Sequence, residues 1–119
     1  MKFPPSYRAF LQKIGALAFA GDTYYGITKD GLTSNSVPCV AFATVKARFQ
    51  NDADDGMVVI KSSGYGPIYS IDTSSVDSNG ESPVIETGLS FKRDKDKIIV
   101  SPSFEVFFSS AINDAIKEL

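Results

Sequence analysis

The sequence predicts an α+β fold, a single domain with a central, mostly antiparallel sheet, and three observations lead to this prediction. Ile and Val together number nineteen against five Leu, and β-branched residues favour strands. The strand-like segments follow one another, joined by short turns that contain Gly, which favours antiparallel pairing. Helical patterns lie near the N-terminus, in the middle and at the C-terminus rather than after every strand, which is typical of α+β folds.

The chain of 119 residues is expected to form one domain over residues 1–119, because domains cluster at about 100–150 residues. A chain of this length can bury enough surface to fold without a disulfide or a metal. Its 43% hydrophobic and 22% charged residues are ordinary for a globular protein and argue against disorder.

The first helical pattern follows Pro4 and Pro5 near the N-terminus. Its apolar residues recur at the spacing of one helical face, at Tyr7, Phe10, Leu11 and Ile14. Gly15 follows, and Gly is the residue that most readily ends a helix in the left-handed conformation. A second, weaker pattern begins near Val37 and Pro38, and its apolar residues are Phe42, Val45 and Phe49.

The third helical pattern is the clearest. Ser101 can cap this helix, and Pro102 suits its first position. An apolar stripe then runs to the C-terminus through Phe104, Phe107, Phe108, Ala111, Ile112, Ala115, Ile116 and Leu119. We expect Phe107 and Phe108 to be mostly buried, and replacing either with Ala costs about 3–5 kcal/mol if it is fully buried.

Strand patterns occupy the segments between the helices. They cover residues 17–20, 23–27, 57–61, 67–72, 83–87 and 97–100. Residues 73–81 are rich in Ser, Asp and Gly and predict a loop.

The composition excludes several classes of enzyme. Histidine is absent and cysteine occurs once, so the chain cannot build a Ser-His-Asp triad, a Cys-His dyad or a histidine metal site. A net charge of −2 makes it a poor ligand for nucleic acid. No apolar run is long enough for a membrane span and no secretory signal is present, which predicts a cytoplasmic protein that does not contact the membrane.

Four short patterns have alternative interpretations. The segment 51–56 has spaced acidic residues and a Gly, like a calcium loop, but its spacing differs and a solvated loop is favoured. Gly64-Tyr65-Gly66 is interpreted as a turn rather than a phosphate-binding loop. Cys39 is interpreted as a structural cysteine, since no histidine is there to activate it. The basic cluster 91–97 is interpreted as a solvated loop.

The predicted partner-binding residues are four aspartates and three tyrosines: Asp52, Asp54, Asp55, Asp72, Tyr24, Tyr25 and Tyr65. If the strands at 57–61 and 67–72 form an antiparallel hairpin, the start of the first lies beside the end of the second. The four carboxylates then gather at one end of the sheet. Their mutual repulsion would be relieved by a basic partner, and an outward-facing tyrosine is a suitable interface anchor.

Three stretches of the chain together resemble the SUKH superfamily, also called the Smi/Knr-type domain. Residues 3–16, which include Pro-Pro-Ser-Tyr, are similar to the opening motif of the family. Residues 58–74 are similar to its central hairpin, which ends in an Asp-Thr pair. Residues 103–108 are similar to the Ser-Phe-x-x-Phe start of its last helix. Family members commonly carry a helix before the opening motif, and we expect this domain to lack it.

The resemblance implies a binding protein without catalytic activity and without a cofactor. Many bacterial members of the superfamily are immunity proteins, which bind a polymorphic toxin that is often a nuclease. The implied partner is therefore a cognate toxin protein with a basic surface. The alternative is a regulatory scaffold that binds cellular proteins or a small ligand, as eukaryotic relatives do. The residues themselves leave the oligomeric state open.

Overall fold

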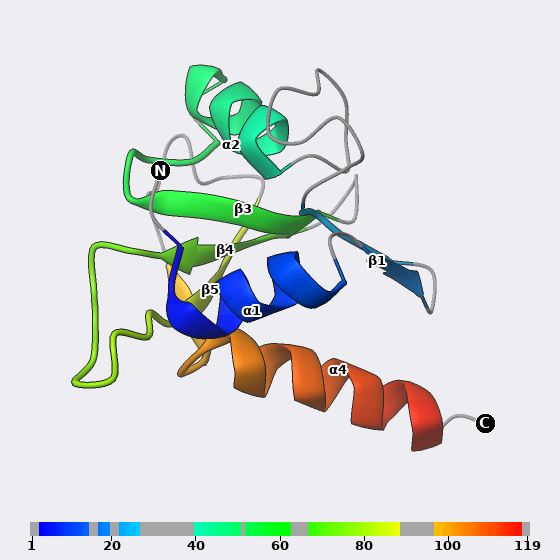
Figure 1. Ribbon diagram of the computed structural model, residues 1–119. Helices are drawn as coiled ribbons and strands as arrows, with labels where there is room; N and C mark the ends of the chain where they lie inside the picture. Colours follow the sequence, from blue (N-terminus) through cyan, green and yellow to red (C-terminus); the bar gives the residue numbers. More distant parts are fainter. Residues whose placement is uncertain are drawn as a thin grey trace.

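A computed structural model describes residues 3–14, 17–19, 22–26, 40–50, 52–62, 67–88 and 97–117 (Figure 1). The strands of these residues form one sheet of six, and each strand pairs antiparallel with the next in the sequence. They are β1 (Leu17–Phe19), β2 (Asp22–Tyr24), β3 (Met57–Ser62), β4 (Ile68–Asp72), β5 (Val84–Thr87) and β6 (Ile98–Ser101). The predicted α+β class and antiparallel sheet are confirmed.

Helices cover both faces of the sheet. They are α1 (Pro5–Lys13), α2 (Val40–Phe49) and α4 (Phe104–Lys117). Figure 1 shows α2 over one face of β3, with α1 and α4 side by side below the other face. In the part of the chain that the structure describes, no helix has both the length and the apolar content needed to cross a membrane.

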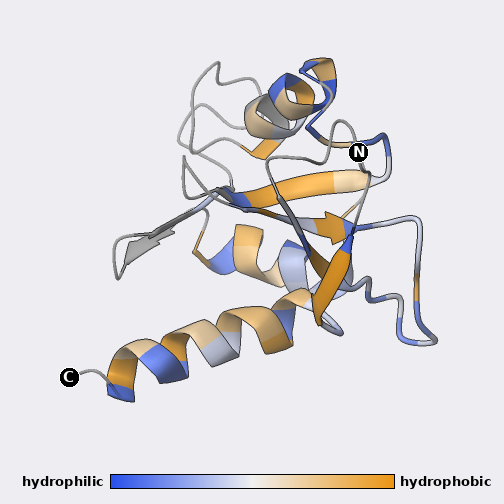
Figure 2. Cartoon of the chain, turned by 180° about the vertical axis from the view of Figure 1, so that it is seen from behind, coloured by the Kyte–Doolittle hydropathy of each residue, from blue (hydrophilic) through white to orange (hydrophobic). Residues whose placement is uncertain are grey.

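Each face of the sheet has its own hydrophobic cluster. The larger cluster lies between the sheet and α1 and α4, and its fully buried members include Tyr7, Ile60, Ile71, Val84 and Phe104. The smaller lies under α2 and consists of Ala47, Ala53, Met57, Val59 and Ile85. The central strands supply both clusters because neighbouring residues of a strand point to opposite faces. Figure 2 accordingly shows these strands as mostly hydrophobic.

The start of α1 is fixed by an acidic residue from the loop before β5. The Ser6 amide donates to Oε2 of Glu81 at 2.9 Å, and the Ser6 hydroxyl donates to Oε1 at 2.7 Å. The same hydroxyl accepts the Glu105 amide at 3.2 Å, at the first turn of α4. A carboxylate beside the amides of a helix N-terminus is favourable, so Glu81 and Ser6 together join the starts of both helices.

The buried side of α2 differs from the sequence-based prediction. Val45 and Phe49 were expected on the packed face, but they are 59% and 88% exposed. The residues of α2 that face the sheet are Val40, Ala43, Thr44 and Ala47, and the last three are smaller than the residues left outside. The Thr44 hydroxyl accepts the amide of Val59 at 3.0 Å, beside a bulge in β3. This close approach of helix and strand admits Ala and Thr at the contact and leaves the larger residues outside.

One expectation for α4 is also corrected. Its cap is Ser103 rather than Ser101, since the Ser103 hydroxyl accepts the Val106 amide at 3.3 Å. Phe104 is buried as expected, and Phe107 and Phe108 are partly buried and pack against the larger hydrophobic cluster.

Candidate partner-binding surface

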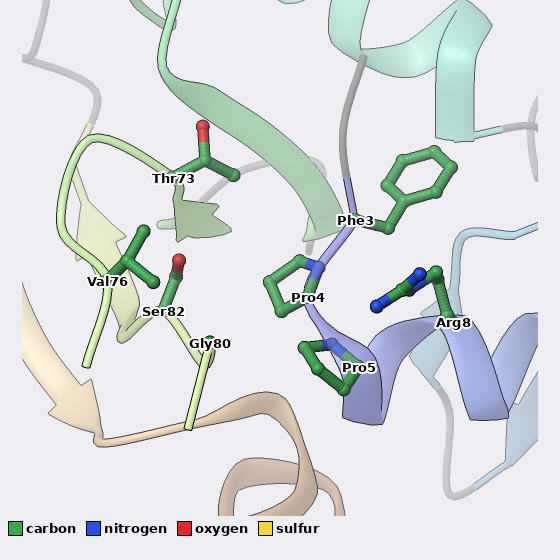
Figure 3. A pocket seen from close by; sticks show the side chains of 8 residues that line it. All are labelled: Phe3, Pro4, Pro5, Arg8, Thr73, Val76, Gly80 and Ser82. Carbon is green, nitrogen blue, oxygen red and sulfur yellow. The ribbon is translucent and has the colours of Figure 1, made fainter. Parts of the chain in front are cut away.

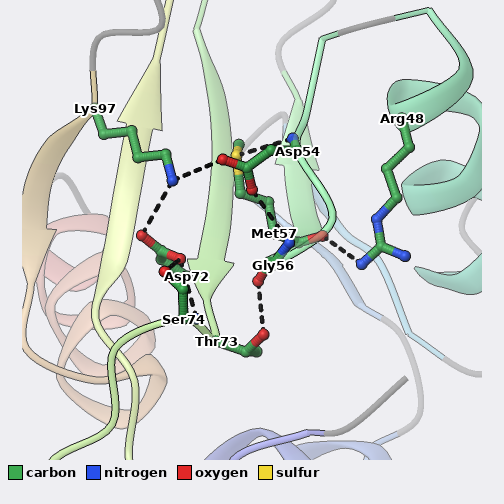
Figure 4. A network of polar contacts seen from close by, with 8 residues as sticks. All are labelled: Arg48, Asp54, Gly56, Met57, Asp72, Thr73, Ser74 and Lys97. Carbon is green, nitrogen blue, oxygen red and sulfur yellow. Dashed lines mark hydrogen bonds and ion pairs between the residues drawn. The ribbon is translucent and has the colours of Figure 1, made fainter.

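The predicted acidic cluster lies at one end of the β3–β4 hairpin. Met57, the first residue of β3, stands opposite Asp72, the last residue of β4. The turn that carries Asp52, Asp54 and Asp55 leads directly into β3. Figure 4 shows Asp54 and Asp72 on neighbouring segments, both pointing toward Lys97. The hairpin therefore brings these two carboxylates together, as the sequence predicted.

Lys97 changes the electrostatics of this cluster. Its Nζ atom lies 2.8 Å from Oδ2 of Asp54 and 3.4 Å from Oδ2 of Asp72. The hydrogen bond to Asp54 is the main cause that raises the pKa of Lys97 above its ordinary value, while burial opposes the rise and the charge of Asp72 adds to it. The ammonium group of Lys97 thus relieves much of the expected repulsion between the carboxylates of Asp54 and Asp72. Sequence reasoning missed this because Lys97 belongs to the basic cluster interpreted as a solvated loop.

Asp72 has a structural role. It is 8% exposed, and its Oδ1 accepts the Ser74 amide at 3.2 Å and the Ser74 hydroxyl at 2.5 Å. The Thr73 hydroxyl donates to the Gly56 carbonyl at 2.7 Å. The Thr73 bond fastens the acidic turn to the end of β4, and Asp72 orders the turn that follows β4 and offers little area to a partner.

Asp52 and Asp55 differ from the two carboxylates that share Lys97. Asp55 is exposed, and among the described residues its carboxylate has no hydrogen bond or ion pair. Asp52 is half-buried, and its amide donates to the Ala47 carbonyl at 2.8 Å. As for the calcium-loop alternative, the described residues hold no group of three acidic or cysteine side chains that could bind a metal ion.

An exposed aromatic residue lies next to the acidic turn. Phe49 ends α2 and is 88% exposed, the highest exposure among the large hydrophobic residues described. Exposed aromatic residues are frequent anchors of protein interfaces. We name Phe49, Asp52 and Asp55 the α2–β3 surface. The sequence pattern had placed Phe49 in the core. The spacing of apolar residues could not show that α2 packs against the sheet through its small residues instead.

A hollow of about 500 Å³ lies beside this end of the sheet (Figure 3). Its walls are Phe3, Pro4, Pro5, Arg8, Thr73, Val76, Gly80 and Ser82. Thr73 belongs both to the hollow and to the polar network of Figure 4. Mostly apolar walls with one guanidinium at the rim suit the apolar side chain of a bound molecule.

Tyr24 lies in the core and not at this surface. Tyr24 is only 2% exposed, because its ring packs in the core with centroids 5.2 Å from Phe108 and 6.3 Å from Phe107. It therefore lacks the outward position expected of an interface anchor. Tyr25 is half-buried, and its carbonyl accepts the Tyr7 hydroxyl at 2.6 Å. Tyr65 lies outside the described residues.

Comparison with known proteins finds one family. The family model described as "SUKH_6: SMI1-KNR4 cell-wall" matches residues 1–108. This range contains all three stretches that carry the resemblance, including the Ser-Phe-x-x-Phe start of α4. No curated protein matches the chain.

Proposed function

This chain belongs to the SUKH_6 family of SMI1-KNR4 domains, and we propose from this premise that it is an immunity protein. It binds a cognate polymorphic toxin in the bacterial cytoplasm and neutralises it without catalysis. The observation that carries the proposal is the family match over 108 residues, because SUKH domains are commonly immunity proteins. The lack of histidine in the chain is consistent with a binding role.

The α2–β3 surface supports binding of a protein with a basic face. Asp55 is exposed without an ion pair to any described residue, and Asp52 lies three residues before it in the same turn. An exposed carboxylate such as that of Asp55 steers a cationic partner, such as the active-site cleft of a nuclease, and raises its association rate. Phe49 adds an apolar contact of high exposure at the same place.

The first experiment identifies the toxin. A toxin domain encoded beside the gene of this chain is expressed with and without it, and cell growth is measured. We expect growth to be restored only when the two proteins are produced together. We also expect the two proteins to co-purify. Several unrelated cytosolic partners without protection from any toxin would contradict immunity and support the scaffold alternative.

The second experiment locates the surface. An Asp52→Asn and Asp55→Asn double variant is expected to associate more slowly with the toxin and to show weaker salt dependence. Phe49→Ala is expected to raise the dissociation constant about thirtyfold, as for a contact worth about 2 kcal/mol. The matched controls on α4 are Asp114→Asn and Ile116→Ala, which should leave binding unchanged. Equal binding by the test and control variants would show that the toxin does not bind at the α2–β3 surface.

A further inference from the structure

The hollow of Figure 3 lies between the start of α1 and the loop that joins β4 to β5. Its apolar walls are Phe3, Pro4 and Pro5 on the helix side and Val76, which is 62% exposed, on the loop side. A volume of about 500 Å³ is within the range of sites for small molecules. The α2–β3 surface shares no residue with this hollow, which is therefore a separate site.

Hydrogen bonds hold both walls of the hollow in place. In the loop, Oδ1 of Asp77 accepts the amides of Asn79 and Glu81 at 2.8 and 3.0 Å. Gly80 has a φ of 82°, which favours glycine, and a side chain there would lie against the ring of Pro5. The carboxylate of Glu81 accepts the amide and the hydroxyl of Ser6. The chain itself thus fixes the shape of the hollow.

Arg8 is the one charged residue among the described residues that line the hollow. It is exposed, and its guanidinium makes no hydrogen bond or ion pair with a described residue. Figure 3 shows the guanidinium extending from α1 toward Pro4 and Pro5. A guanidinium pairs with a carboxylate through two parallel hydrogen bonds. A single positive charge suits a monoanion better than the double charge of a phosphate group.

Ser82 offers a second hydrogen-bond donor from the loop side. It is 2% exposed, yet its hydroxyl has no hydrogen bond to a described residue and is not among the polar atoms sealed in the core. Figure 3 shows this hydroxyl between Val76 and Pro4. A polar side chain so deeply buried normally has a partner, and a ligand oxygen in the hollow would supply one. Thr73 cannot donate in this way, because its hydroxyl already donates to the Gly56 carbonyl at 2.7 Å.

We propose that the hollow binds a small monocarboxylate that has an apolar body and a second oxygen acceptor. The carboxylate pairs with the guanidinium of Arg8 at the rim, the apolar body covers the prolines and Val76, and Ser82 donates to the second oxygen. The basis is complementarity, since one unpaired cation and one unpaired donor face an otherwise apolar hollow. Because the ligand is an anion, this site is distinct from the acidic surface proposed for a basic toxin.

The test uses the chain alone, so it does not depend on the proposed toxin. The chain is titrated with 4-oxo-4-phenylbutyrate, and amide chemical shifts are followed by NMR. We expect a dissociation constant of about 1 mM, with shift changes at Val76, Gly80 and Ser82. The corresponding amide lacks the charge and should bind about tenfold more weakly. The acid without the ketone, 4-phenylbutyrate, should bind about threefold more weakly.

Three variants assign these preferences to residues. Arg8→Gln should abolish the preference for the acid over the amide, and Ser82→Ala should abolish the preference for the ketone. Lys13→Gln removes the same charge from α1 outside this hollow and should change neither preference. Arg8→Gln should also keep the unfolding midpoint of the unaltered chain, because the Arg8 side chain is exposed and unpaired among the described residues.

Equal binding of the acid and the amide by the unaltered chain would overturn the proposal. Loss of the acid preference in Lys13→Gln would also overturn it, because the ligand would then lie in the groove between α1 and α4 that Lys13 lines. Binding of a peptide that ends in phenylalanine, without binding of the small acid, would overturn it in favour of the carboxyl terminus of a partner protein.

Discussion

Lys97 reaches the carboxylates of Asp54 and Asp72 from the residue just before β6. Three segments that are distant in the sequence meet at this ammonium group. The Asp72 side chain is 11% exposed and that of Lys97 is 29% exposed, while Asp54 is more open at 43%. Ion pairs of this partial exposure contribute modestly to stability. Their larger effect is to hold the acidic turn against the end of β4.

Replacing Lys97 with Met keeps most of the apolar stem and removes both ion pairs. We expect Lys97→Met to lower the free energy of unfolding by about 1 kcal/mol at pH 7. The folded state raises the pKa of Lys97 above its ordinary 10.5. The contribution of the two ion pairs to the free energy of unfolding is therefore fully present below pH 10.5 and declines as the pH rises through the raised pKa of Lys97. Urea unfolding of the unaltered chain and of Lys97→Met from pH 7 to 11 measures the difference in stability. Equal unfolding midpoints at pH 7 would contradict the prediction.

At the scale of the elements, the short motifs of the sequence have structural roles. Ser6 links the starts of α1 and α4 through Glu81 and Glu105. Tyr7 is fully buried and donates a hydrogen bond to the Tyr25 carbonyl. Phe104 packs edge-on against Tyr7, with 4.9 Å between ring centroids. The motifs that identify the family therefore build the contact between α1 and α4.

Burial along α4 predicts a graded response to truncation. Phe104 is 2% exposed, so Phe104→Ala should lower the free energy of unfolding by about 3–5 kcal/mol. Phe108→Ala should cost clearly less, because Phe108 is only half-buried and the void it leaves is open to water. The unfolding midpoints of both variants in denaturant measure these losses, provided that the dependence of the free energy on denaturant concentration is unchanged. An equal or larger loss for Phe108→Ala would show that α4 docks differently.

At the scale of the whole molecule, stability is concentrated at the centre of the sheet. β3 and β4 are paired on both sides, and β3 contributes Val58 and Ile60 to one cluster and Met57 and Val59 to the other. The last turns of α4 lie at the opposite extreme, where Ile116 is 59% exposed. The candidate surface lies between these extremes, at one end of the β3–β4 hairpin.

This distribution predicts the order of amide hydrogen exchange. The amides of β3 and β4 should exchange slowest, through global unfolding, and those of the last turns of α4 should exchange much faster, through local opening. Hydrogen exchange followed by NMR measures each amide separately. Equal protection of β4 and of residues 113–117 would contradict the unequal burial seen in the structure.

Most elements could be predicted from the sequence because their signals are local. The spacing of Tyr7, Phe10 and Leu11 predicts α1, and all three are buried. The strand patterns predict β3, β4 and β5 to within a residue or two. The position of Asp54 beside Asp72 also followed from the sequence, because one hairpin with a short turn brings the two residues together.

The tertiary structure decided which side of each element is covered. α2 packs on Ala43 and Ala47, which leaves Phe49 88% exposed, and periodicity alone cannot distinguish these two orientations. Lys97 neutralises part of the acidic cluster from a distant segment, and a contact between residues 43 positions apart leaves no local pattern. The sequence by itself thus determined the family, the elements and the hairpin. The exposed surface arises from packing between distant elements, because burial depends on what the rest of the chain places nearby.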